Sequence, residues 1–223
     1  MVKKRNLIKL LAGAFLISNF GLISNVASAA SNSNNVGFTT EDVVNSNQET
    51  NSSTTNKETQ NLTWAYPFAS QKKNGVRPMY KAQTFGMTDY ARSLSPLSYF
   101  HDGWDFGFSE VGHSTVKAIH PGTVKEVRQA PGLGWYVWVI SPDKYVEIYQ
   151  EGFNSRKDIT VKPGQKIKTG QKIGKLTGSH LHLGVTKTNH KYINQHGYPC
   201  NNWYRDVGTW LNPVKVIEDN MNK

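Results

Sequence analysis

The chain has 223 residues, of which 26 are Lys or Arg and 16 are Asp or Glu, giving a formal net charge of +10. It contains one cysteine, Cys200, so an internal disulfide is excluded. The positive charge indicates an anionic partner, but charge alone does not distinguish nucleic acid from another anionic polymer.

The first 29 residues have the pattern of a secretory signal peptide. Residues 3–5 are basic, residues 10–26 are apolar with polar interruptions, and residues 27–29 read Ala-Ser-Ala, a small-residue cleavage site. A retained membrane anchor fits less well, because the apolar run is short for a span of ~20 residues. We therefore expect residues 1–29 to be removed on export, leaving a secreted chain without a stable membrane span.

Residues 30–61 are rich in Ser, Asn, Thr and Gln and almost free of large apolar side chains. Such a segment buries too little apolar surface to offset its ordering entropy, so we interpret it as a disordered linker or propeptide. The first 61 residues hold five of the 26 basic and four of the 16 acidic residues, which leaves 21 against 12 in residues 62–223. The exported domain is therefore strongly basic.

Residues 62–223 have the pattern of a single, mostly antiparallel β domain, and about 160 residues suffice for one core. Residues 141–144, Ser-Pro-Asp-Lys, predict a tight turn inside a hairpin. No stretch shows helical periodicity over three turns, and the segment around Trp210 and Pro213 is expected to pack onto the sheet. Five segments are expected to be strands, namely 116–119, 122–127, 136–141, 145–150 and 180–186.

Two short stretches carry the candidate chemistry. In the first, His101 and Asp105 stand four residues apart among glycines that disfavour a helix. In the second, His180 and His182 alternate with leucines, so both imidazoles point to the same face if the segment is a strand. Three protein ligands from His and carboxylate, with the fourth position left to water, are typical of hydrolytic zinc sites.

The spacing leaves two assignments open. Either His182 joins His101 and Asp105 as the ligand and His180 moves protons, or His180 is the ligand and His182 the acid–base residue. One zinc ion per domain would polarise a carbonyl and bring the pKa of its bound water to about 7, which suits amide hydrolysis.

Four segments together resemble the lysostaphin-type (LytM) zinc endopeptidases, which cut the peptides of bacterial peptidoglycan. They are His101-x-x-x-Asp105, the Gly-Thr-Val strand at 122–124, the Lys- and Gly-rich run 161–174, and Ser179-His-Leu-His-Leu-Gly184. The likeness runs from about residue 62 to about residue 217.

The resemblance implies that His101, Asp105 and His182 bind zinc and that His180 is catalytic. It implies a mainly β, split-barrel domain with a narrow groove for an extended peptide. One departure stands out: most of the family has Tyr-x-His where this chain has Tyr149-Gln-Glu151. Glu151 is then either a general base, as Glu is in other zinc peptidases, or an exposed strand-end carboxylate beside a His180 that works alone.

We further expect Trp104, between two ligands, and Tyr149, near Glu151, to contact the substrate. The resulting prediction is a secreted or wall-associated zinc metalloendopeptidase that hydrolyses peptidoglycan. It is expected to be a monomer and to function as a bacteriolysin or autolysin. The alternative is a non-catalytic wall-binding or hydrolase-activating relative. Anionic wall polymers are expected partners by charge, whereas specific nucleic-acid binding has no supporting motif.

Overall fold

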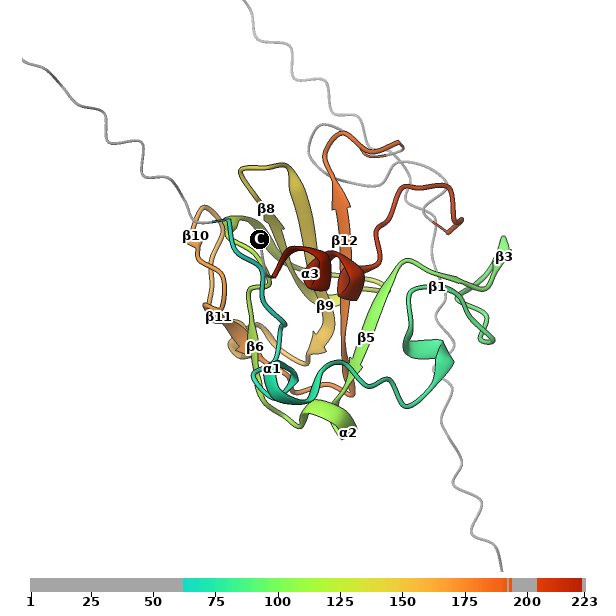
Figure 1. Ribbon diagram of the computed structural model, residues 1–223, viewed down its shortest axis with the longest axis horizontal. Coiled ribbons are helices and arrows are strands. Elements are labelled where there is room, and N and C mark those ends of the chain that lie inside the picture. The colour runs from blue at the N-terminus through green and yellow to red at the C-terminus, as the bar shows by residue number, and fades with distance from the viewer. Residues whose placement is uncertain (1–61, 192, 194–203, 222–223) are drawn as a thin grey trace, which may run out of the picture. The chain divides into compact units, whose positions relative to one another are not determined.

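The computed structural model describes residues 62–191, 193 and 204–221 (Figure 1). The predicted signal peptide at 1–29, the predicted linker at 30–61 and Cys200 lie outside the described residues. Within those residues, no helix has the length and apolar character to cross a membrane.

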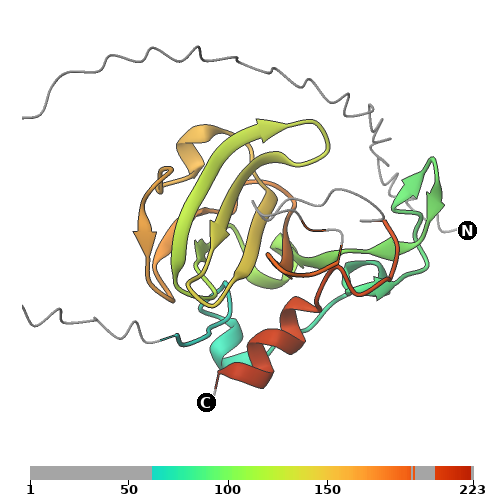
Figure 2. The same cartoon turned by 90° about the horizontal axis from the view of Figure 1, so that it is seen from above.

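A six-stranded sheet in which every neighbouring pair is antiparallel forms the centre of the domain, so the prediction of a mainly β, antiparallel fold is confirmed. Figures 1 and 2 show its strands curling around a common core. Their order across the sheet is β10 (Lys166–Ile167), β7 (Gly122–Ala130), β8 (Gly134–Ile140), β9 (Tyr145–Phe153), β12 (His180–Lys187) and β5 (Gly103–Gly107).

Shorter elements surround this sheet. Three two-stranded ribbons pair β1 (Gly86–Met87) with β4 (Phe100–His101), β2 (Ser93–Leu94) with β3 (Leu97–Ser98), and β6 (Thr115–Lys117) with β11 (Lys172–Lys175). The helices are α1 (Gln71–Asn74), α2 (Phe108–Val111) and α3 (Pro213–Asn220), with 3₁₀ turns η1 (Lys81–Gln83) and η2 (Arg156–Asp158).

The predicted hairpin joins β8 to β9. The Lys144 N–H donates to the Ser141 carbonyl over 3.1 Å, and Lys144 has the left-handed φ of 72° that closes the turn. The Ser141 hydroxyl accepts from the Tyr145 N–H over 2.8 Å. The turn fixes the β8–β9 register, and with it the position of β9 beside β12.

Alternation in β12 decides which side chains reach the core. Leu181, Leu183 and Val185 are completely buried in the main apolar cluster, while His180 and His182 point to the opposite face. On the histidine face, Gly184 lies against the Trp210 ring. A Cβ atom added at Gly184 would be 3.3 Å from that ring. The sheet therefore has a core face and a face that carries the histidines.

The C-terminal helix α3 was not predicted from the sequence. Its eight residues are too few for three turns of periodicity, although Asn212 caps the first turn and Pro213 occupies the first helical position. Val214, Val216 and Ile217 are buried in the main core, and α3 contacts β12 and β5 (Figure 1). The expected packing of the Trp210–Pro213 segment onto the sheet is confirmed, with a helix extending from it.

Candidate metal centre

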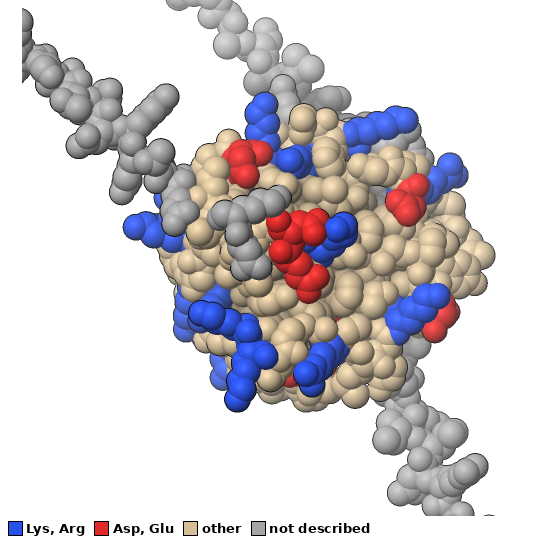
Figure 3. All heavy atoms as spheres, viewed as in Figure 1, with Lys and Arg blue, Asp and Glu red and all other residues tan. Residues whose placement is uncertain are grey.

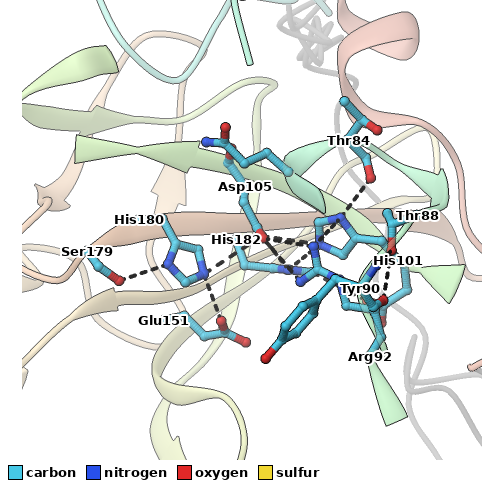
Figure 4. A network of polar contacts seen from close by, with 12 residues as sticks. Thr84, Thr88, Tyr90, Arg92, His101, Asp105, Glu151, Ser179, His180 and His182 are labelled. Carbon is cyan, nitrogen blue, oxygen red and sulfur yellow. Dashed lines mark hydrogen bonds and ion pairs between the residues drawn. The ribbon is translucent and has the colours of Figure 1, made fainter. Parts of the chain in front are cut away.

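Three ligand atoms from three strands converge on one point (Figure 4). His101 ends β4, Asp105 is the centre of β5, and His182 lies directly opposite Asp105 in the β5–β12 register. The His182 Nδ1 atom is 3.0 Å from Asp105 Oδ1 and 3.1 Å from His101 Nε2, and His101 Nε2 is 3.2 Å from the same carboxylate oxygen. All three side chains are buried.

This triangle fits zinc. Ligand bonds of about 2.0–2.2 Å at tetrahedral angles place donor atoms about 3.3–3.5 Å apart, only slightly wider than the separations in the structure. The donor set of two imidazole nitrogens and one carboxylate oxygen is also that of hydrolytic zinc centres. His101, Asp105 and His182 are therefore the residues that would hold the ion.

The tautomers of the ligands agree with this role. The Nδ1 atom of His101 lies 2.9 Å from the Thr84 carbonyl oxygen, which can only accept, so Nδ1 carries the proton and Nε2 keeps its lone pair. The Nε2 atom of His182 is 3.6 Å from Asp102 Oδ1, which leaves Nδ1 of the same ring turned to the centre. Gly103 makes room for that ring, since a Cβ there would meet His182 Nε2 at 2.3 Å.

The electrostatics of the centre favour a positive charge. Burial alone would raise the pKa of Asp105, but its contacts with the His182 and His101 rings hold that pKa well below its usual range. Burial would likewise lower the pKa of His182, yet the hydrogen bond to Asp105 and the charges of Asp102 and Asp105 raise it to about 9. A site that stabilises a proton this strongly is suited to a dication in the same place.

His180 and Glu151 form a second polar pair beside the ligands (Figure 4). The His180 Nε2 atom is 3.0 Å from Glu151 Oε2 and 3.8 Å from Asp105 Oδ1, while its Nδ1 atom is 2.9 Å from the Ser179 hydroxyl. Since the carboxylate of Glu151 accepts, Nε2 of His180 donates to it. His180 stays half-buried, so the pair faces the side of the centre that remains open to solvent.

Glu151 adopts a backbone conformation that few side chains adopt. Its φ is 63°, in the left-handed region, and its N–H donates to the Leu133 carbonyl over 3.0 Å. The β8–β9 register shifts in the same part of the hairpin, between Trp135 and Val137. Such a conformation costs of order 1 kcal/mol or more and occurs in turns, as at Lys144, and at functional sites.

The protonation of the pair is coupled. Burial alone would raise the pKa of Glu151, but the hydrogen bond from His180 and the charges of His182 and His180 together lower it. Burial would lower the pKa of His180, but the bond to Glu151 and the charge of Asp105 raise it. The positive charge of a bound zinc ion would oppose the shift on His180.

The two residues expected to contact substrate do not lie at this site. Trp104 and Tyr149 both pair with Leu183, on the core face of the sheet, and both are buried. The Tyr149 hydroxyl donates to Glu147 and accepts from the Ile119 N–H over 2.9 Å. The reason is the two-residue period of a strand, which turns the neighbours of Asp105 and Gln150 away from the centre.

The structure adds residues that the sequence did not single out. Gln150 lies directly opposite His182 on the site face, and Arg92, Thr84 and Gln83 approach the ligands from an upstream segment. The alternation Tyr149-Gln-Glu151 could have indicated Gln150. No motif marks the upstream residues, because they reach the site only through the folding of residues 79–101.

The comparisons with known proteins agree with this geometry. The sequence pattern of peptidase family M23 matches residues 99–195, and this range includes all three ligand residues. The peptidoglycan DD-endopeptidase ShyB of Vibrio cholerae serotype O1 is 35% identical over 95 residues, which are 40% of this chain and 21% of that protein. The chain thus spans about a fifth of the length of this curated relative.

Among solved structures, cbpa from L. salivarius REN is 36% identical with a TM-score of 0.61, covering 72% of this chain and 97% of that one. The catalytic domain of lysostaphin from Staphylococcus simulans is 20% identical with a TM-score of 0.44, covering 68% and 98%.

The fold and the ligand triangle define a metallopeptidase. Residues 99–195 match peptidase family M23, and His101, Asp105 and His182 within this region are the zinc-binding residues.

Proposed function

We propose that the chain is a secreted zinc endopeptidase that hydrolyses peptide bonds in bacterial peptidoglycan. The observation that carries this proposal is the ligand triangle with the His180–Glu151 pair beside it, in a domain of a peptidase family. The curated relative that matches is a peptidoglycan endopeptidase by name, and the export pattern of residues 1–29 would deliver the enzyme to such a substrate.

Zinc held by His101, Asp105 and His182 would supply Lewis acidity for amide hydrolysis. Glu151, whose pKa is lowered beside the centre, takes the proton of water as its oxygen bonds to the carbonyl carbon, and gives it to the amine that leaves when the C–N bond breaks. His180 donates through Nε2 to the Glu151 carboxylate and holds it for this transfer. Ser179 holds the His180 ring through Nδ1.

A non-catalytic wall-binding or hydrolase-activating relative is the competing function. The specific observation in its favour is Glu151 in place of the second family histidine. Against it, the ligand triangle is intact and the left-handed Glu151 is aimed at His180. A carboxylate so placed supports a glutamate-dependent variant of the reaction.

We also propose that the enzyme is a bacteriolysin or autolysin, because the sequence resembles the bacteriocin enterolysin A. The resembling segments are Phe100–Gly107, Ile148–Glu151, Ser179–Gly184 and Gly208–Pro213. The resemblance includes Glu151, which supports a branch of the family with this residue. Hydrolysis assays on the walls of competitor bacteria and on the producer's own wall distinguish a bacteriolysin from an autolysin.

Charge supports an interaction with anionic wall polymers. Residues 159–187 contain six lysines and no Asp or Glu. Lys172 of β11 lies directly opposite Lys117 of β6, an arrangement of like charges that destabilises a ribbon unless an anion lies over it. Figure 3 shows Lys and Arg side chains gathered at the lower left, over the edge where Figure 1 places these strands. We propose non-specific binding there, by a monomer, without specific nucleic-acid recognition.

The test is digestion of purified peptidoglycan from several bacterial species by the zinc-loaded chain after signal removal. Mass spectrometry of the products should show new amino termini, with His180→Ala as the matched inactive control. Release of no new amino terminus from any wall would contradict the proposed function. Wall binding without hydrolysis under added zinc would support the competing one.

A further inference from the structure

Part of the outer shell of the zinc site comes from a segment that precedes the family match at residues 99–195. Residues 79–92, here called the upstream segment, lie beside β4 and β5 (Figure 4). From this segment, the Thr84 carbonyl orients His101, and the Gln83 side chain donates to the Asp105 carbonyl over 3.3 Å. Arg92 contacts the ligand carboxylate itself.

Arg92 and the histidines divide the two oxygens of Asp105 between them. Both terminal nitrogens of Arg92 donate to Oδ2, over 3.2 and 3.3 Å. The other oxygen, Oδ1, faces His182 Nδ1 at 3.0 Å and His101 Nε2 at 3.2 Å. One oxygen is therefore occupied by a guanidinium that never loses its proton, and the other is turned to the centre.

The contact of Arg92 with His101 is not a competing hydrogen bond. One guanidinium nitrogen lies 3.3 Å from His101 Nδ1, but Nδ1 already donates to the Thr84 carbonyl, so both groups are donors. Arg92 is held independently, because its N–H donates to the Ser98 carbonyl over 2.7 Å and its guanidinium lies 5.8 Å from the Tyr90 ring. The Arg92 side chain is 22% exposed. Among the three ligands, Asp105 is the one that accepts hydrogen bonds from the guanidinium group.

We propose that Arg92 is the positioning residue that makes Asp105 a one-oxygen ligand of the zinc ion. By occupying Oδ2, it prevents the carboxylate from binding through both oxygens and keeps a coordination position free for water and substrate. The inference rests on the metal site and is independent of which bond or polymer the enzyme cuts. It assigns a role in the zinc site to a residue outside the family match.

Zinc affinity alone does not separate this role from simple electrostatics. A cation beside a dication repels it, so charge alone predicts that Arg92→Gln binds zinc more tightly. A second zinc–oxygen bond from the released Oδ2 predicts the same sign, so the coordination number of the bound metal decides between the two. Zinc affinity is measured on the metal-free protein by competition with a chromophoric chelator.

Cobalt substitution reads the coordination directly, since four-coordinate Co²⁺ absorbs visible light more strongly than five-coordinate Co²⁺. We expect a weaker visible band for Arg92→Gln because Asp105 then contributes both oxygens. Arg92→Lys keeps the charge but lacks the two parallel N–H donors, so its visible band should be weak as well, which separates positioning from charge. Arg128→Gln removes one exposed guanidinium far along β7 and is the matched control.

Weaker zinc binding by Arg92→Gln, or a cobalt spectrum identical to that of the unsubstituted protein, would overturn the proposal. If Arg92→Gln does not fold, Arg92→Lys decides the question alone: a wild-type spectrum would overturn the proposal, and an altered one would support it. Both readouts are independent of peptidoglycan hydrolysis, so a failure here leaves the proposed function standing.

Discussion

The two faces of the β5–β12–β9 region differ although they share the same three strands. On one face, His182, Asp105 and Gln150 meet at a polar centre; on the other, Leu183, Trp104 and Tyr149 pack in the core. Neighbours in the sequence therefore have unrelated functions. The two-residue period of a strand, more than closeness in the sequence, therefore decides which side chain reaches the zinc site.

The largest effects should come from adjacent substitutions on opposite faces. Asp105→Ala should abolish zinc binding and hydrolysis in a chain that still folds, because it removes a ligand and no core volume. Phe106→Ala should instead destabilise by about 3–5 kcal/mol, because Phe106 is completely buried. Zinc titration and chemical denaturation measure the two. Similar profiles for the two variants would contradict the division into faces.

Glu151 tests the open side of the site. Glu151→Gln keeps the size of the side chain but removes the base, so we expect kcat to fall roughly 10²–10⁴-fold with zinc content unchanged. Steady-state kinetics on peptidoglycan fragments measure this. An unchanged kcat would assign the proton transfer to His180 alone. Glu151→His then separates two origins of the site: raised activity fits a weakened form of the usual family site, and lost activity fits a glutamate-dependent branch.

On the core face, Tyr149→Phe should affect stability and not substrate binding. Loss of the hydroxyl removes the partner of the buried Glu147 and of the Ile119 N–H, which should cost about 1–3 kcal/mol. The KM should not change, because Tyr149 faces away from the zinc site. A raised KM at unchanged stability would restore Tyr149 to the substrate-binding surface.

The smallest effect, taken per pH unit, concerns Glu147. Burial raises the pKa of Glu147 well above its usual range, although the Tyr149 hydroxyl opposes the shift. The folded chain therefore keeps a proton that the unfolded chain loses above about pH 4.3, so stability falls as pH rises from there, by at most about 1.4 kcal/mol per pH unit. Glu147→Gln should fall less steeply between pH 5 and 8 in denaturation of the metal-free protein. Parallel slopes would contradict a neutral buried Glu147.

The sequence was sufficient for the fold class, for five of the strands and, with the family resemblance, for the ligand set. The strands and the 141–144 turn follow from alternation and turn residues, and the metal ligands follow from His101, Asp105 and His182 with their family resemblance. The strands and the turn depend on residues close together in the chain, and each half of the ligand set is a short local motif. The short helix α3 escaped prediction because its stability comes from packing three buried side chains and not from its own periodicity.

What could not be predicted depends on contacts between distant segments. Arg92 and Thr84 reach the ligands through the path of the upstream segment, which no local pattern encodes. The left-handed conformation of Glu151 depends on the bulge between β8 and β9. Trp104 was expected at the site because it stands next to Asp105, but its strand position turns it into the core.

The most direct test of the account is the zinc content of two variants of β12 after dialysis, measured by inductively coupled plasma mass spectrometry. His182→Ala removes a ligand, whereas His180→Ala removes a neighbour that points to the same face but bonds to Glu151. We predict one zinc ion per molecule in His180→Ala, as in the unsubstituted protein, and none in His182→Ala. Zinc retained by His182→Ala and lost from His180→Ala would contradict the assignment of the metal centre.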